Sequence, residues 1–137
     1  MRLGTWHRSL VLLALITVGA TGVIWFVLRD LAGFAPDELQ HIVLVAHGVA
    51  SFAVLIAFGS VLPLHSLGGW RQGRNRWSGL GVVSVLAILA VSALVLYYGD
   101  EAWQAWARLI HLVVGGVAVI VVPLHIVLGR RARSKSV

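Results

Sequence analysis

Histidine is the residue whose type and spacing could support chemistry in this sequence. The chain has six, all in or beside long apolar runs: His7, His41, His47, His65, His111 and His125. An ionisable side chain inside a membrane is costly, which makes each histidine a functional candidate. His41 lies just before the second run, near a helix end, and is interpreted as interfacial. His111 and His125 lie 14 residues apart. On one helix they are within about 40° of the same face and about 21 Å apart along the axis.

Four runs without formal charge must supply the helices that position these imidazoles: 9–28, 42–70, 78–99 and 109–129. Each has the roughly 20 apolar residues that a transmembrane helix needs, and in lipid the backbone must satisfy its own hydrogen bonds. The first run is longer than the apolar core of a signal peptide, so we expect it to stay uncleaved. The sequence predicts an all-α fold, a transmembrane four-helix up-down bundle in one domain, 1–137, with helices at about 7–29, 39–67, 78–98 and 103–129.

Charge predicts the orientation of the bundle. Nine of the eleven basic residues precede the first run, lie between the second and third, or follow the fourth. All five acids lie in the other two connections, with only Arg29 and Arg108. Short loops rich in Lys and Arg stay in the cytoplasm, which predicts an N-in, C-in protein of the bacterial inner membrane, multi-pass and surrounded by lipid. The net charge of +6 therefore reflects topology and does not indicate a nucleic-acid partner.

Counting depth along the predicted helices pairs the histidines. His47 comes to the level of His111 near the outer surface, and His7 comes to the level of His125 near the inner surface. Two imidazoles that face each other across a helix bundle are the axial ligands of a low-spin haem, and bundle cores build such sites from facing helices. The two pairs predict two haem b groups. His65 lies a full turn deeper than the level of His125 and is a second candidate for the inner site.

Small residues beside the outer pair could make room for a planar cofactor. Gly48 adjoins His47, and Gly115 follows His111 by one turn. Helix packing is the alternative role, because glycine commonly mediates helix contacts in membranes. Arg108 precedes His111 by one turn on the same face, and we predict that it pairs with a propionate of the outer haem. An ordinary interfacial arginine is the alternative.

Several kinds of site are excluded by composition. There is no cysteine, so disulfides, thiolate metal sites and covalent haem attachment are absent. No carboxylate or lysine lies inside the apolar runs, so nothing resembles a zinc or di-iron ligand set. The sequence also lacks a P-loop, a dinucleotide fingerprint and a Ser/His/Asp constellation.

The histidine placement resembles that of the di-haem cytochrome b subunits of membrane formate dehydrogenases and nickel–iron hydrogenases. The matching segments are Trp6-His7-Arg8-Ser9-Leu10, Val45-Ala46-His47-Gly48, Ile110-His111 and Pro123-Leu124-His125, with Tyr97-Tyr98-Gly99-Asp100-Glu101 before the last helix. The resemblance implies an electron-transfer subunit rather than a stand-alone enzyme. It also implies exchange with a quinone at the inner haem and with a periplasmic or membrane redox partner at the outer one.

Two departures from that family stand out. The chain is shorter than the usual subunits, and it carries His65, which the pattern does not require. The third run has no histidine, which separates the chain from the related superoxide-oxidising four-helix cytochromes. A haem-free membrane scaffold or assembly subunit remains an alternative function. A small proton-coupled transporter that uses histidines as a relay is another.

Overall fold

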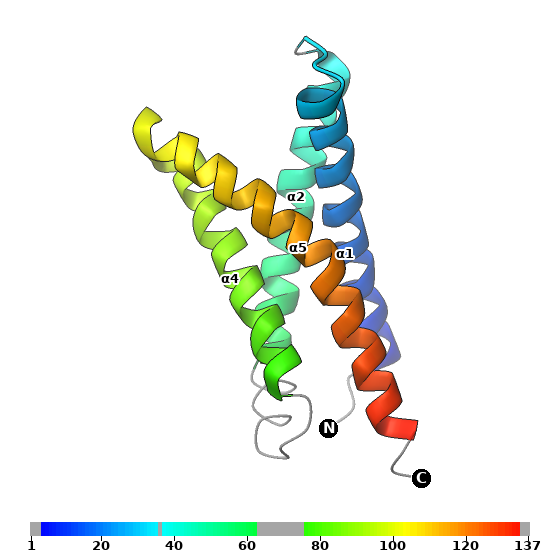
Figure 1. The fold of residues 1–137 in the computed structure, drawn as a ribbon. Helices are drawn as coiled ribbons and strands as arrows, with labels where there is room; N and C mark the ends of the chain where they lie inside the picture. Colours follow the sequence, from blue (N-terminus) through cyan, green and yellow to red (C-terminus); the bar gives the residue numbers. More distant parts are fainter. Residues whose placement is uncertain (1–3, 36, 63–75, 135–137) are drawn as a thin grey trace. The chain divides into compact units, whose positions relative to one another are not determined.

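The chain is all-α. The computed structural model describes residues 4–35, 37–62 and 76–134. Within them lie four long helices: α1 (Thr5–Phe26), α2 (Glu38–Val61), α4 (Arg76–Tyr98) and α5 (Glu101–Ser134) (Figure 1). A π-helical turn, Val27–Leu31, continues α1. All four helices are long and apolar enough to cross a membrane. These four candidate spans indicate a multi-pass membrane protein. They confirm the prediction of an all-α fold with four membrane-spanning helices as far as helix length and composition can.

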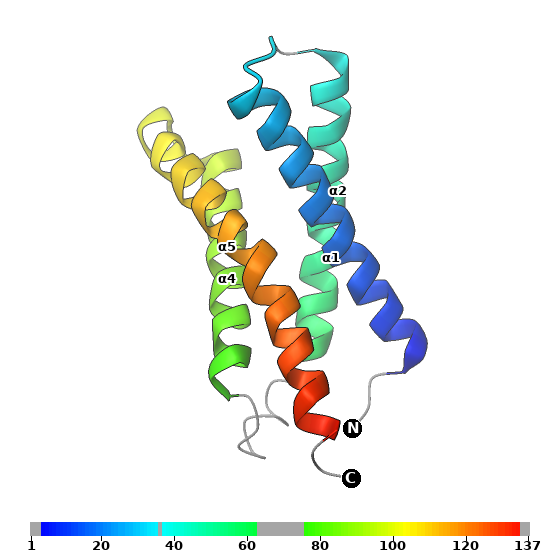
Figure 2. The same ribbon diagram turned by 45° about the vertical axis from the view of Figure 1, so that its right-hand side comes forward.

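The helices form two compact units, Met1–His65 and Ser66–Val137. In the first unit α1 packs along α2, and in the second α4 packs along α5 (Figure 2). The two helices of each unit run in opposite directions. We call the units the first and second hairpin, and we distinguish the loop end of each, where its two helices are connected, from its open end. The prediction of one four-helix domain joins the two hairpins and stays a prediction.

Aspartate caps begin the second helix of each hairpin. Oδ1 of Asp37 accepts a hydrogen bond from the backbone N–H of Gln40 at 2.7 Å, and Oδ1 of Asp100 accepts one from that of Trp103 at 3.1 Å. The first N–H groups of a helix have no partner within the helix, so a capping oxygen stabilises its start, typically by about 1 kcal/mol. The caps explain why α2 starts at Glu38 and α5 at Glu101, slightly before the predicted positions.

A tight connection joins α4 to α5 through Gly99 and Asp100. Gly99 donates its N–H to the carbonyl of Val95 at 2.8 Å, and Gln104 Nε2 donates to the carbonyl of Gly99 at 2.8 Å. A Cβ atom at position 99 would lie 2.6 Å from the Val95 oxygen, so only glycine fits this turn. The short connection fixes which residues of α4 and α5 lie at the same level.

Apolar side chains cover the outside of the helices. Among the described residues the buried apolar side chains are Ala50, Val54 and Ala107, whereas many large ones are exposed. Such a surface is unusual for a soluble protein but suits helices that face lipid tails. Exposed aromatic residues stand at the helix ends, as is typical of membrane interfaces: Trp6, Trp77, Tyr97, Tyr98, Trp103 and Trp106.

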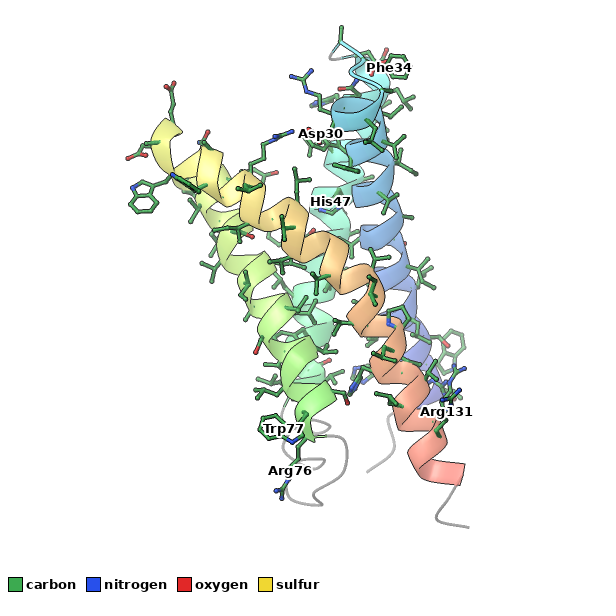
Figure 3. All side chains as sticks on the ribbon, in the orientation of Figure 1. Asp30, Phe34, His47, Arg76, Trp77 and Arg131 are labelled. Atoms are coloured by element: carbon green, nitrogen blue, oxygen red, sulfur yellow. The ribbon has the colours of Figure 1, made fainter. Side chains whose placement is uncertain are left out.

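Charge is divided between the two ends of each hairpin. In the second hairpin Arg76 and Trp77 begin α4 at the open end, and Arg131 lies near the end of α5 (Figure 3). In the first hairpin Asp30 and Phe34 belong to the loop end. In the second hairpin the basic residues Arg76 and Arg131 therefore lie at the open end, opposite the acidic connection at Asp100 and Glu101.

Candidate functional site

The second hairpin holds one histidine against a buried hydroxyl near its loop end. Nδ1 of His111 on α5 lies 2.9 Å from Oγ of Ser92 on α4, within hydrogen-bond distance. Ser92 is only 4% exposed, and its hydroxyl also donates to the Leu89 carbonyl of its own helix at 3.0 Å. The His111 ring is therefore fixed by a group that water does not reach.

The same hairpin repeats the arrangement near its open end. Nδ1 of His125 lies 3.2 Å from Oγ of Ser78, which stands in the first turn of α4. A Cβ atom at the neighbouring Gly79 would lie 3.9 Å from Cε1 of His125, an ordinary contact distance. The start of α4 thus provides both the polar partner and the surface on which this imidazole rests.

In the first hairpin, His47 of α2 contacts α1 near the loop end. Its Nδ1 lies 3.0 Å from the Val18 carbonyl oxygen and 3.2 Å from Oγ1 of Thr21. A Cβ atom at Gly22 would lie 3.0 Å from Cε1 of His47. A larger residue at position 22 would displace the ring, so the absence of a side chain there lets His47 approach α1 (Figure 3 labels His47).

His7 makes the fourth contact, at the open end of the first hairpin. Its Nε2 lies 2.9 Å from Oγ of Ser60 on α2. The Ser60 hydroxyl also donates to the Ala57 carbonyl at 2.7 Å. His7 differs from the other three histidines in the ring nitrogen that meets the hydroxyl, since they use Nδ1 and His7 uses Nε2.

We call these four contacts the His–hydroxyl pairs. The loop-end pairs are His47–Thr21 and His111–Ser92, and the open-end pairs are His7–Ser60 and His125–Ser78. On α1, α4 and α5 the two members lie 14 residues apart, and on α2 they lie 13 apart. With a rise of about 1.5 Å per residue, each hairpin carries imidazoles at two levels about 20 Å apart.

The remaining predicted site residues differ in their exposure. Arg108 is exposed on α5, and Gly48 and Gly115 are half-buried on α2 and α5. A Cβ atom at Gly115 would meet nothing within 4 Å, so there is open space beside it. His65 lies outside the described residues. The pairings of His47 with His111 and of His7 with His125 each join the two hairpins, and they stay predictions.

Each hairpin offers one imidazole at each of its two levels as a possible metal ligand. Among residues 4–35, 37–62 and 76–134, no group of three or more His, Asp or Glu side chains is close enough to hold a metal ion. A zinc ion in a protein is usually held by three or four side-chain ligands that converge on one point. Iron in a porphyrin already has four nitrogen ligands, so that one imidazole on each side completes it. Single imidazoles at two levels therefore fit haem better than a bare ion.

The hydroxyl partners were not predicted from the sequence. One feature of the sequence could have indicated these partners. Ser78 and Ser92 have the 14-residue spacing of His111 and His125, and a short connection between antiparallel helices brings equal spacings into register. A serine in an apolar helix usually bonds to the backbone of its own helix. The serine spacing therefore predicts contacts with the histidines only once the register of α4 against α5 is known.

Comparison with known proteins identifies no family. No family model matches the chain, and neither a curated protein nor a solved structure matches it significantly. Fold and site define an all-α protein with four candidate membrane spans, in which four histidines each contact a hydroxyl of the neighbouring helix.

Proposed function

We propose that this protein is a membrane-bound di-haem b-type cytochrome that carries electrons across the membrane between a quinone pool and a periplasmic redox partner. The observation that carries the proposal is the set of four His–hydroxyl pairs. Each imidazole lies in an apolar span, and each contacts a hydroxyl of the neighbouring helix at one of two levels. Incidental histidines would not be expected to repeat this arrangement in both hairpins.

His47 and His111 would hold one haem, and His7 and His125 the other. Bound haem b supplies reversible one-electron transfer, and the protein contributes the axial ligands, their burial and the nearby charges. In a membrane, the apolar helix surfaces would keep water away from these imidazoles. The open space beside Gly115, and the similar space at Gly19, where a Cβ atom would also meet nothing within 4 Å, could admit a planar group.

The orientation we propose is N-in and C-in. Basic residues occur at the open ends of both hairpins, with Arg8 in the first and Arg76 and Arg130 in the second, while the acids Asp37 and Glu101 occur at the loop ends. Basic segments are retained in the cytoplasm. The loop-end pairs would then lie toward the periplasm and the open-end pairs toward the cytoplasm.

The test is the haem content of the purified full-length protein. A pyridine haemochrome assay should give two b haems per chain, and the reduced protein should show the absorption bands of bis-imidazole ligation. Replacement of His41, which is exposed at the start of α2, should leave both haems in place. A purified wild-type protein without haem would refute the proposal and favour a membrane scaffold.

A further inference from the structure

The hydrogen bonds of Ser92 determine where the proton of His111 resides. A serine hydroxyl has one hydrogen to donate. Ser92 directs it to the Leu89 carbonyl at 3.0 Å, so toward His111 Nδ1, at 2.9 Å, the same oxygen can only accept. When Ser92 donates to Leu89 in this way, the hydrogen bond to His111 requires the hydrogen on Nδ1. Ser92 is buried, so water does not compete for the bond.

His47 reaches the same state by a second route. Its Nδ1 lies 3.0 Å from the carbonyl oxygen of Val18, and a carbonyl oxygen can only accept. The Thr21 hydroxyl, 3.2 Å from the same nitrogen, donates its hydrogen to the Thr17 carbonyl at 2.7 Å. These two contacts each place an acceptor at Nδ1, which favours the tautomer in which Nδ1 of His47 is the donor.

We propose that Ser92 and Thr21 are positioning residues that hold His111 and His47 as Nδ1–H tautomers, so that Nε2 is the atom each imidazole offers to a haem iron. A neutral imidazole with hydrogen on Nδ1 has its lone pair on Nε2. Ligating histidines commonly donate their other N–H to an acceptor, which fixes the ring and makes the ligand a stronger electron donor. The tautomers follow from hydrogen bonding alone, whereas the role toward iron rests on the proposed function.

His7 provides a contrast within the same chain. The Ser60 hydroxyl donates to the Ala57 carbonyl at 2.7 Å and so accepts from His7 Nε2 at 2.9 Å. With the Ser60 hydrogen directed to Ala57, the hydrogen of His7 lies on Nε2, which is the opposite tautomer. The loop-end histidines are prepared for ligation through Nε2, and His7 is not.

The first experiment measures the tautomers without haem. The full-length chain, labelled with 15N and 13C in histidine and produced under haem limitation, is examined by NMR, and circular dichroism verifies that it is helical. We expect an Nδ1–H signal from His111 that Ser92→Ala converts in part to Nε2–H, while Ser84→Ala, at an exposed position of α4, changes nothing. An Nε2–H signal from His111 in the otherwise native chain overturns the inference.

The second experiment measures redox potentials of the haem-loaded protein. Loss of the acceptor weakens electron donation by the imidazole, so Ser92→Ala should raise one of the two midpoint potentials and lower haem retention at that site by about 10-fold or more. Thr21→Val should act in the same direction on the same haem, and Thr21→Ser, which keeps the hydroxyl, should restore the native value. Two haems with potentials unchanged in Ser92→Ala and Thr21→Val would refute the positioning role and leave the cytochrome intact.

The two proposals fail in different ways. A wild-type chain that binds no haem but shows the Nδ1–H signals refutes the cytochrome proposal and supports the assigned tautomers. If the loaded chain binds two haems but the haem-free chain shows Nε2–H signals at His47 and His111, the cytochrome proposal is supported and the assigned tautomers are refuted.

Discussion

The imidazole of His47 on α2 lies directly against the backbone of Gly22 on α1. A Cβ atom at position 22 would be 3.0 Å from Cε1 and 3.3 Å from Nδ1 of the ring. The first distance is shorter than a comfortable carbon–carbon contact, so a side chain at position 22 must move the ring. Such a movement would disturb the 3.0 Å contact between Nδ1 and the Val18 carbonyl.

Gly22→Val should therefore remove the haem held by His47 and destabilise the first hairpin by about 1–3 kcal/mol, the usual cost of overpacking. Haem content and thermal unfolding followed by circular dichroism measure the two effects. Gly59→Val is the matched control, because Gly59 is exposed on α2 and a Cβ atom there meets nothing within 4 Å. Two haems in Gly22→Val would contradict the assignment of His47 as a ligand.

Removal of either loop-end imidazole should remove a single haem. We expect His111→Ala and His47→Ala each to reduce the haem content from two to one per chain, because an axial position is lost while the open-end pairs are unaffected. Optical redox titration should show that both variants lose the same component. Loss of different components would mean that His47 and His111 do not share one haem.

Apolar run length predicted the helices and the end of α4 at Tyr98, but it did not predict the starts of α2 and α5 or the end of α5. Hydropathy marks the part of a helix that lies in lipid, whereas the end depends on caps and on the absence of a helix breaker. The predicted end at residue 129 coincides with the end of the apolar run, yet α5 continues to Ser134. The start of α5 at Glu101 follows from the Asp100 cap, a local interaction that hydropathy does not report.

The histidines of the candidate site could be predicted from the sequence, but the residues that they contact could not. His111 and His125 follow from their spacing on one helix. Ser92 does not, because its contact with His111 depends on the register that Gly99 and Asp100 impose between α4 and α5. The role of Gly22 likewise depends on how closely α1 approaches α2.

Arg108 provides a test of nearby charge. It precedes His111 by three residues and so lies on the same face of α5. A positive charge beside a haem favours the reduced form, so Arg108→Gln should lower the midpoint potential of the haem that His111→Ala removes. Arg29→Gln, an exposed arginine at the loop end of the first hairpin, is the control. An unchanged potential in Arg108→Gln would leave Arg108 an ordinary interfacial residue.

The orientation of the chain can be tested with reporter fusions. Because basic residues gather at the open ends of the hairpins, we expect a reporter fused after Val137 to report the cytoplasm. A reporter inserted after Gly33, in the connection between α1 and α2, should report the periplasm. Periplasmic activity of the fusion at Val137 would overturn the N-in, C-in orientation.

The sharpest prediction concerns the ligand that completes the open-end site with His125. His7 fits the level of His125, whereas His65, outside the described residues, lies 18 residues from His47, a rise of about 27 Å against about 21 Å between His111 and His125. We therefore expect His7→Ala to leave one haem and His65→Ala to leave two.

Ser60 adds a second measurement, because its oxygen accepts from Nε2 of His7 at 2.9 Å. Nδ1 is crowded by the adjacent Cβ, so His7 must give up this hydrogen bond to ligate through Nε2. Ser60→Ala removes the competing partner and should keep both haems, with retention at this site equal to or above that of the wild type. Ser78→Ala, which removes the Nδ1 partner of His125, should instead weaken the same site. Loss of the haem in His65→Ala, with two haems still bound in His7→Ala, would exclude His7 as the ligand.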